Sequence, residues 1–239
     1  MIDISFIIPA YDEEKKILND LILANQFLSS NNFSGEIIVI DDGCSDNTFQ
    51  NAEKSREQIE SQLILLSNDI NRGKGYSIKK GILRSKGKYI IYFDAGATIP
   101  LSDALKGIEL IKSRECDIAF GSRKLPESKI IKKQKLDRKL ASFLFLQFCK
   151  MFFNIDKSFT DTQCGFKVLD GDIARELFEK VTLNGFLFEI ELIMLAGRNN
   201  YKIKEFPITW KCDRDSRINF VRTPTKIVKE IMQLRKIKF

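Results

Sequence analysis

Histidine is absent from all 239 residues, and this absence restricts the possible chemistry more than any other feature of the composition. Without imidazole, a Ser-His-Asp triad, a Cys-His pair and a histidine-bound metal are excluded. Any catalysis must therefore use Asp, Glu, Lys, Arg, Tyr or Cys side chains, or a hard cation held by oxygen atoms.

Signals for disulfides, structural zinc and membrane spans are also missing. The cysteines number five, are scattered and form no Cys-x-x-Cys pair, which favours reduced thiols in a cytosolic protein. No window reaches 18 uninterrupted apolar residues, so we expect no transmembrane helix. The start of the chain, Met1–Pro9, has no basic segment and leads into an apolar run, so we expect no signal peptide.

The residues that are present suit one sizeable α/β domain. Apolar residues make up 44% of the chain, which is ample for a core, and neither an internal repeat nor a low-complexity linker divides it. The net charge of +7 and the pI near 9.1 indicate an anionic partner. Nucleic acid, a phospholipid surface and phosphorylated small molecules are all compatible with this charge.

Two patterns alternate over the first 120 residues. Short apolar runs predict buried strands, and segments within 14–51, 73–86 and 102–113 have the apolar spacing of helices. The strands are expected at 4–8, 36–40, 63–66, 89–93 and 117–120. This alternation predicts a Rossmann-like, mostly parallel central sheet flanked by helices.

Acidic and turn-forming residues gather where the predicted strands end, which is the rim at which such sheets bind ligands. They are Pro9-Ala-Tyr-Asp-Glu13, Asp41-Asp42-Gly43, Asn68-Asp69 and Asp94-Ala-Gly96.

Two of these regions have a clear chemical use. Asp41 and Asp42 can accept hydrogen bonds from a base and a ribose, while Ser45 or Asp46 caps the next helix. Residues 71–75, Asn-Arg-Gly-Lys-Gly, offer backbone amides, two cations and a helix N-terminus, a suitable setting for a diphosphate. Neither the P-loop nor the dinucleotide-binding glycine pattern is present.

The second half of the chain has a different texture. Residues 129–139 carry six positive charges and one negative charge, and a Phe-rich helical segment follows at 140–153. This combination is typical of a membrane-surface element. A core helix whose polar residues face water is also compatible with the sequence of this segment. Further helices are expected near 171–180, near 187–197 and from about 224, with a strand over 203–209.

A set of motifs covering nearly the whole chain, taken together, resembles the family-2 glycosyltransferases of GT-A fold. The closest resemblance is to the dolichyl-phosphate glucosyltransferases and related polyprenyl-phosphate sugar synthases. The motifs are Pro9-Ala-Tyr-Asp-Glu13, Asp41-Asp42-Gly43, Gly73-Lys74-Gly75, Asp94-Ala95, Gly121-Ser-Arg123 and Asp161-Thr-Gln-Cys-Gly165-Phe-Lys167. The strings Phe186–Leu192 and Ile203–Trp210 strengthen the resemblance.

The resemblance implies a role for each matching position. Residues 1–123 would form the nucleotide-sugar-binding half of a single domain, and 124–239 the acceptor-facing and membrane-facing half, with amphipathic C-terminal helices. Arg123, Asp161 and Gln163 would be catalytic, and Glu189 would lie near the acceptor. The nucleotide sugar would contact Pro9, Ala10, Tyr11, Glu13, Asp41, Asp42, Lys74, Asp94 and Ala95.

The implied reaction moves a hexose, with inversion, from UDP or GDP to a polyprenyl phosphate such as dolichyl phosphate. Mg²⁺ or Mn²⁺ would be held at Asp94. A lipid phosphate is already an anionic nucleophile near neutral pH, so the absence of histidine is no obstacle. The enzyme would be cytoplasmic and peripheral to the membrane. A transferase acting on a soluble acceptor is the alternative, and a nucleic-acid partner is least favoured because no nucleic-acid module is recognised.

One departure from the family affects the expected metal. The family reads Asp-x-Asp after the fourth strand, whereas this chain reads Asp94-Ala95-Gly96. Three interpretations follow. In the first, Asp94, water and the diphosphate still hold Mg²⁺. In the second, nearby cations replace the metal. In the third, the protein binds a nucleotide sugar without transferring the sugar.

Overall fold

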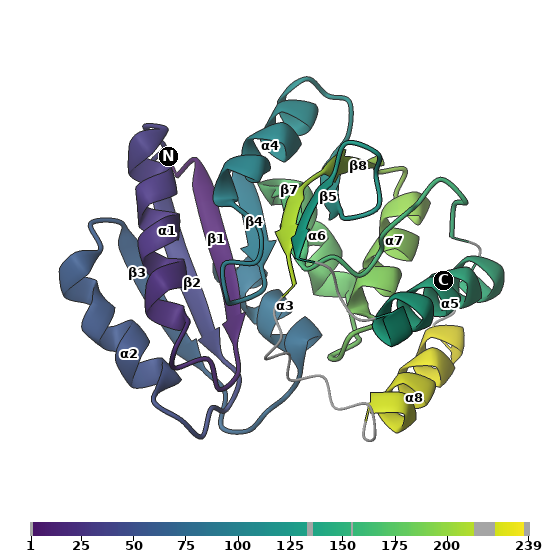
Figure 1. The fold of residues 1–239 in the computed structure, drawn as a ribbon, viewed down its shortest axis with the longest axis horizontal. Helices are drawn as coiled ribbons and strands as arrows, with labels where there is room; N and C mark the ends of the chain where they lie inside the picture. The colour runs from purple at the N-terminus through teal and green to yellow at the C-terminus, as the bar shows by residue number, and fades with distance from the viewer. Residues whose placement is uncertain (1, 133–135, 154, 213–222, 237–239) are drawn as a thin grey trace.

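The structure, a computed structural model, describes residues 2–132, 136–153, 155–212 and 223–236 (Figure 1). Within these ranges, the side chains of 136–141, 223–227 and 236 are left out of the description.

The elements follow one another as the patterns of the sequence suggest. The strands are β1 Ile4–Ala10, β2 Gly35–Asp41, β3 Gln62–Ser67, β4 Tyr89–Phe93, β5 Ile118–Ser122, β6 Lys129–Lys132, β7 Phe166–Asp170, β8 Ile203–Pro207 and β9 Thr209–Lys211. The α-helices are α1 Ile17–Ser30, α2 Thr48–Lys54, α3 Lys74–Arg84, α4 Ala104–Lys112, α5 Leu136–Phe153, α6 Gly171–Lys180, α7 Phe188–Arg198 and α8 Thr223–Lys236. Short 3₁₀ turns lie at Ser55–Gln58 and Leu101–Asp103.

Seven strands form the central sheet, in the order β3-β2-β1-β4-β7-β5-β8. Strands β1 to β4 pair in parallel, and β5 pairs in parallel with β8. Only β7, between β4 and β5, runs antiparallel to its neighbours in this sheet. The predicted mostly parallel sheet flanked by helices is confirmed.

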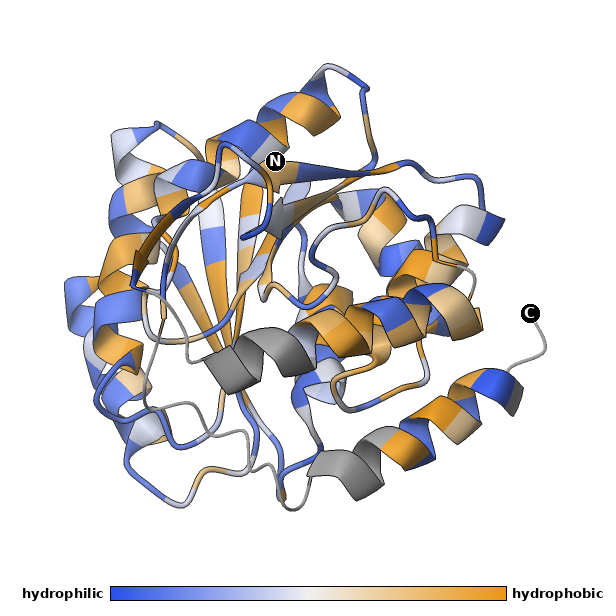
Figure 2. Ribbon diagram, turned by 45° about the vertical axis from the view of Figure 1, so that its right-hand side comes forward, coloured by the Kyte–Doolittle hydropathy of each residue, from blue (hydrophilic) through white to orange (hydrophobic). Residues whose placement is uncertain are grey.

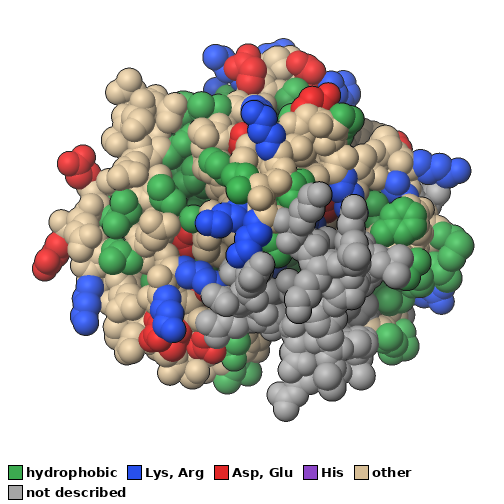
Figure 3. Space-filling view, in the orientation of Figure 1, with side chains coloured by type: hydrophobic (Ala, Val, Ile, Leu, Met, Phe, Trp, Pro, Cys, Tyr) green, Lys and Arg blue, Asp and Glu red, His purple; other side chains and the backbone are tan. Residues whose placement is uncertain are grey.

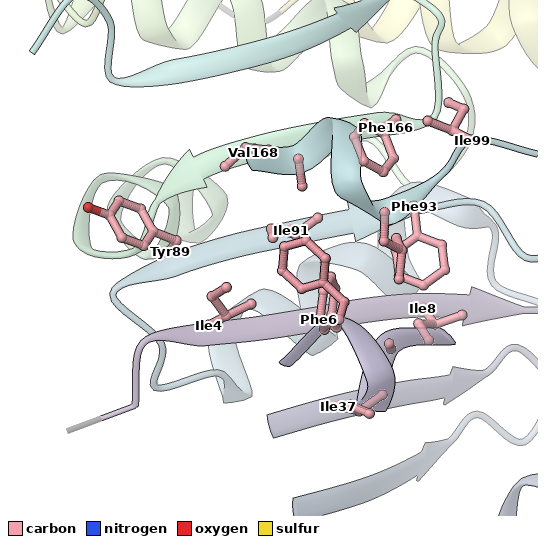
Figure 4. Close-up of a cluster of buried hydrophobic side chains, with 14 of the residues drawn as sticks. Ile4, Phe6, Ile8, Ile37, Tyr89, Ile91, Phe93, Ile99, Phe166 and Val168 are labelled. Atoms are coloured by element: carbon pink, nitrogen blue, oxygen red, sulfur yellow. The ribbon is translucent and has the colours of Figure 1, made fainter. Parts of the chain in front are cut away.

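Two layers of helices cover the sheet because successive strand residues point to opposite faces. On one face, Phe6 and Ile8 of β1 pack with helices α1, α2 and α4 (Figure 4). On the other face, Ile7 packs with α3, α6 and α7, and α5 and α8 reach the same cluster. The strands are mainly hydrophobic along their length, whereas α5 and α8 mix hydrophobic and hydrophilic residues (Figure 2).

All five strands expected in the first half are present, each with its ends within two residues of the prediction. Strand β7 was not predicted because its residues, Phe-Lys-Val-Leu-Asp, follow the turn motif and include Lys167. Lysine is rarely buried unless it is paired, yet Lys167 is fully buried. The strand expected over 203–209 is divided, since β8 stays in the main sheet and β9 pairs with β6 in a second, two-stranded sheet.

The predicted basic run is only partly described. Residues 129–132 form β6, and the side chains of 133–139 lie outside the described residues. The Phe-rich segment is helical, as expected, but the helix begins earlier, at Leu136. Across the described ranges, no helix combines the length and the apolarity needed to cross a membrane.

Candidate functional site

The ends of β1 and β2 bring six of the predicted nucleotide-binding residues to one rim. Tyr11 is exposed, Pro9 and Glu13 are half-buried, and Ala10 is buried at the end of β1. The Ala10 carbonyl accepts a hydrogen bond from the Asp42 backbone N–H, at 2.9 Å, which fixes the two loops against each other. The Asp41 carboxylate accepts from the backbone N–H of Cys44 at 2.8 Å.

Asp42 organises the glycine loop. It is almost fully buried, and its carboxylate accepts hydrogen bonds from the Asn68 side chain at 2.8 Å and from the backbone N–H groups of Arg72 at 3.0 Å and Gly73 at 2.9 Å. These two amides, expected from the sequence to face a diphosphate, are therefore bound to Asp42 instead. The loop is held in place by the protein.

The two glycines of this loop allow close packing against the loop before α7. Gly73 has a φ of +105°, and a Cβ atom at this position would lie 2.5 Å from the carbonyl oxygen of Asn184. At Gly75, a Cβ would lie 2.7 Å from the carbonyl oxygen of Leu183. The backbone N–H of Tyr76 donates to the Asn184 carbonyl at 3.1 Å. These contacts hold the start of α3, in the first half of the chain, against the loop before α7, in the second half.

Lys74, at the first position of α3, forms an ion pair with Asp94 at the end of β4. The Lys74 Nζ and Asp94 Oδ1 atoms are 2.7 Å apart, and the Asp94 side chain is 48% exposed. Burial acts to lower the pKa of Lys74, but the nearby carboxylates of Asp94 and Glu189 together outweigh it, so the pKa lies above its ordinary value. Lys74 therefore stays charged at neutral pH. Ala95, predicted to contact the nucleotide sugar, follows directly in this loop and is half-buried.

The loop after Asp94 rests on a residue that sequence reasoning missed. Asp20 of α1 is buried, and its two carboxylate oxygens each accept a hydrogen bond at 2.8 Å, from the backbone N–H groups of Gly96 and Ala97. Burial raises the pKa of Asp20 to about 7, against the effect of these two N–H groups. No sequence signal marked Asp20, because an acid in a helix normally faces water.

Arg123 and Asp161 form the second ion pair of the site. Arg123 donates from Nε at 2.6 Å and from Nη2 at 2.8 Å to the two carboxylate oxygens, and its backbone N–H donates at 3.1 Å. Burial acts to raise the pKa of Asp161, but Arg123 overcomes it and holds this pKa below its usual range. The guanidinium also lies over the Trp210 ring, 5.2 Å from its centroid. Two of the three predicted catalytic residues are thus brought together.

Glu205 of β8 positions Asp161 by binding its backbone, a role that the sequence did not reveal. Its carboxylate accepts hydrogen bonds from the Asp161 backbone N–H at 2.7 Å, and from the backbone and hydroxyl of Thr160 at 2.8 and 2.9 Å. Glu205 belongs to the string Ile203–Trp210 that supports the family resemblance. Its place in that string was the one sequence signal that could have marked it as a residue of the site.

Next to Asp161, two polar atoms have no partner within the described part of the chain. They are Thr162 Oγ1 and Gln163 Nε2, and both atoms are buried. An unpaired buried polar group costs free energy, so such groups at a site usually meet a ligand. The predicted role of Gln163 beside the sugar stays a prediction, and this arrangement suits it.

Glu189 is buried beneath the same turn. Its carboxylate pairs with Lys167 Nζ at 2.6 Å and accepts from the Tyr92 hydroxyl at 3.2 Å. Lys167 also donates to the carbonyl of Cys164, inside the turn. The acceptor contact predicted for Glu189 stays a prediction. The structure places this carboxylate where it supports the turn through Lys167.

The donor set at the end of β4 is poor for a divalent cation. Asp94 is paired with Lys74, Gly96 has no side-chain oxygen, and both oxygens of Asp20 accept N–H groups. These residues do not fit a resident Mg²⁺ or Mn²⁺ ion held by two carboxylates. Elsewhere on the rim, one group offers candidate ligand atoms within 4.8 Å of one another, namely Asp12, Cys44 and Asp46.

Comparison with known proteins identifies the family. The profile described as glycosyl transferase family 2 matches residues 5–178. The dolichyl-phosphate beta-glucosyltransferase of Dictyostelium discoideum is 32% identical over 242 residues, which cover 97% of this chain and 73% of that protein. The Saccharomyces cerevisiae protein of the same name is 31% identical over 248 residues, covering 97% of this chain and 74% of that protein.

Solved structures of low sequence identity share the fold. Glucosyl-3-phosphoglycerate synthase from Mycobacterium tuberculosis, in complex with Mn²⁺, uridine diphosphate and glucosyl-3-phosphoglycerate, gives a TM-score of 0.71 at 16% identity, covering 98% of this chain and 80% of that chain. S. aureus TarS gives a TM-score of 0.63 at 16% identity, and the match covers 98% of this chain and 64% of that chain. Together with the family match and the geometry of the rim, these likenesses show that the chain is a glycosyltransferase of family 2 with the GT-A fold.

Proposed function

We propose that this enzyme transfers glucose from UDP-glucose to the phosphate of a polyprenyl phosphate such as dolichyl phosphate, with inversion at the sugar carbon. The names of the relatives support glucose and the dolichyl acceptor. Support for the uracil base comes from a fold neighbour solved with uridine diphosphate.

The observation that carries the proposal is that three carboxylates around the turn 161–165 are paired with cations. The pairs are Asp94 with Lys74, Asp161 with Arg123, and Glu189 with Lys167. A sugar hydroxyl needs a general base to remove its proton, and a carboxylate bound to a cation is a weak base. A phosphate has lost its protons near neutral pH, so this cluster favours a phosphate acceptor over a hydroxyl acceptor.

In the proposed reaction, a phosphate oxygen of the acceptor attacks the anomeric carbon opposite the diphosphate. The new carbon–oxygen bond forms while the bond to the diphosphate breaks, and the electron pair of that bond leaves with UDP. The protein has to bring two anions together and stabilise the leaving diphosphate. Lys74 and the partly exposed Arg123 supply positive charge for both tasks.

A membrane surface is the proposed source of the lipid acceptor. Helices α5 and α8 lie side by side (Figure 1), and Arg235 of α8 lies over the Phe152 ring of α5, 5.2 Å from its centroid. Both helices expose large hydrophobic side chains: Phe143, Leu144, Met151, Phe152, Val228 and Met232. Hydrophobic side chains gather on the side of the molecule where α5 lies (Figure 3). Such a face suits peripheral binding to a bilayer.

A transfer assay with two acceptors tests the proposal. UDP-glucose is supplied with either a short polyprenyl phosphate or the matching polyprenol, and glucosyl product is measured. We expect product from the phosphate alone. Arg123→Lys keeps the charge but loses the paired hydrogen bonds that the guanidinium donates to Asp161. We expect the rate of glucosyl transfer by this variant to fall about tenfold or more. Arg175→Lys is the control, because Arg175 lies at the other end of the sheet beside Gly87.

The remaining outcomes separate the alternatives. Equal or greater transfer to the polyprenol, or to a soluble glycan, would contradict the phosphate acceptor. Donor binding without transfer to any of these acceptors would favour a non-catalytic nucleotide-sugar-binding homologue.

A further inference from the structure

We infer that the ammonium group of Lys74 takes the place of a divalent metal ion at the end of β4 and, together with Arg123, neutralises the donor diphosphate. The inference rests on the proposed function in one respect, namely that the donor is a nucleoside diphosphate sugar. It adds that donor binding needs no divalent cation.

The first support is the position of Lys74. Its Nζ lies 2.7 Å from Asp94 Oδ1, within the range of a charge-assisted hydrogen bond, so the strand-end carboxylate already has a cation. Lys74 begins α3, and the preceding glycine is held by Asp42 and packed on Asn184. The ammonium is therefore set by the fold rather than by a chance surface contact.

The second support is that the backbone after Asp94 is adapted to the loss of the second acid. Gly96 has a φ of +109°, a conformation that side-chain-bearing residues rarely adopt, and Ala97 follows at +48°. Asp20 holds both of their N–H groups. A second carboxylate at position 96 is thus absent from the sequence and disfavoured by the loop itself.

The third support is that Lys74 and Arg123 flank one turn. The Asp94 backbone N–H donates to the Gly165 carbonyl at 3.0 Å, and a Cβ atom at Gly165 would lie 1.9 Å from Asp94 Oδ2. Arg123 binds Asp161 at the other end of the same turn. The charge of Glu189 also contributes to raising the pKa of both Lys74 and Arg123, as expected if the three groups lie near one another.

These two side chains can do the electrostatic work of the missing ion. Each carries one positive charge, so together they match the formal charge of a divalent cation. Preorganised cations aimed at the leaving group stabilise the charge that develops on it. Burial acts to lower the pKa of Lys74, but the nearby carboxylates of Asp94 and Glu189 hold it above its ordinary value, so the charge persists over the neutral pH range.

Calorimetric titration of the full chain with UDP, and separately with GDP, tests the inference. Each titration is made in EDTA and again in Mn²⁺. We expect one of the nucleotides to bind with affinities that agree within about twofold between the two conditions. Lys74→Met should weaken this binding about tenfold or more, equivalent to about 1.4 kcal/mol. Lys79→Met is the matched control, because it removes one charge from the same helix. The Lys79 ammonium lies away from the site, where it donates to the carbonyl oxygens of Glu179 and Val181.

The outcomes distinguish the inference from the proposed function. If Mn²⁺ strengthens binding to the wild-type chain tenfold or more, the inference is wrong and the donor assignment stands. If Lys74→Met binds as well as Lys79→Met, the inference is also wrong. If neither nucleotide binds the folded protein under either condition, the proposed donor itself is contradicted.

A gain-of-metal variant provides a second test. Gly96→Asp restores the acidic pair, and we expect its nucleotide affinity to become Mn²⁺-dependent. Circular dichroism checks that it folds, since the positive φ at this position strains any side chain. If the folded variant stays insensitive to Mn²⁺, the missing second acid is not what removed the metal from this site, and that part of the inference is contradicted. If the variant fails to fold, the Lys74→Met comparison decides.

Discussion

At the scale of single residues, Gly165 determines where Asp94 can lie. A Cβ atom at position 165 would fall 1.9 Å from Asp94 Oδ2, so the carboxylate occupies space that only glycine leaves open. The missing side chain therefore brings the end of β4 against the turn that carries Asp161. A substitution here should act on the site more than on the core.

We predict that Gly165→Ala displaces Asp94 and disturbs its pair with Lys74, weakening UDP binding about tenfold or more while the chain still folds. Calorimetry and thermal unfolding measure the two effects. Gly197→Ala is the control, since beyond its chain neighbours and its own helix backbone nothing lies within 4 Å of its Cβ position in α7. That helical change should stabilise the protein by about 0.5–1 kcal/mol without altering UDP binding. Unchanged UDP affinity in Gly165→Ala would contradict the packing argument.

Asp20 gives a prediction for the pH dependence of stability. Its pKa is raised by burial from the ordinary value of 3.8 to about 7 in the folded protein. Between these values the folded state binds more protons than the unfolded state, so this residue makes stability fall as pH rises from about 4 to 7. Asp20→Asn removes this contribution. Urea unfolding at a series of pH values should therefore show a flatter profile for the variant, and parallel profiles would contradict the prediction.

At the scale of elements, the pair of Lys167 and Glu189 joins β7 to α7 inside the protein. Both side chains are almost completely buried, and Tyr92 of β4 adds a hydrogen bond to Glu189. Taking one partner away leaves an uncompensated charge in the core, which typically costs about 3–5 kcal/mol. Taking both away leaves no such charge. The pair thus couples β7 to α7.

A double-mutant cycle tests this coupling. We expect Lys167→Met and Glu189→Gln each to lower the free energy of unfolding by several kcal/mol, and the double variant to lose much less than the sum. Urea denaturation measures all three variants. Losses that add within about 0.5 kcal/mol would contradict the coupling. The Glu189→Gln variant also tests the predicted acceptor contact, through the KM for polyprenyl phosphate.

At the scale of the whole molecule, helices from distant parts of the chain form one exposed hydrophobic face on a protein of net charge +7. Leu144 and Met151 are seven residues apart, two turns along α5, and so lie on the same side of that helix. This face and the positive charge together predict salt-sensitive binding to an anionic bilayer.

Vesicle co-sedimentation tests this surface. We expect binding to phosphatidylglycerol vesicles that weakens as salt is raised. Met151→Glu should weaken it about tenfold, because burying this side chain contributes about 1.5–3 kcal/mol. Leu83→Glu makes a similar change at an exposed position of α3 and is the control. An equal loss in both variants would contradict a specific face, and tighter binding to RNA or DNA than to vesicles would favour a nucleic-acid partner.

The sequence predicted the parallel part of the fold well because its signals are local. Runs such as 89–93 are apolar enough to be strands wherever they pack, and the strand order then places Asp42 and Asp94 on one rim. The pairing of Arg123 with Asp161, which are 38 residues apart, was not predicted, because the family resemblance gave only a separate role to each residue. The structure supplies the contact itself.

What the sequence by itself determined was the family motifs, the strands of the first half and the loss of the second acid at Gly96. What only the tertiary structure decided was which charges meet. Lys74 faces Asp94, Asp20 holds the altered loop, and Lys167 enters the core. Burial changes the cost of a charge according to its partners, and those partners come from remote elements. No local pattern contains that information, so the cation of this site could be located only once the chain was folded.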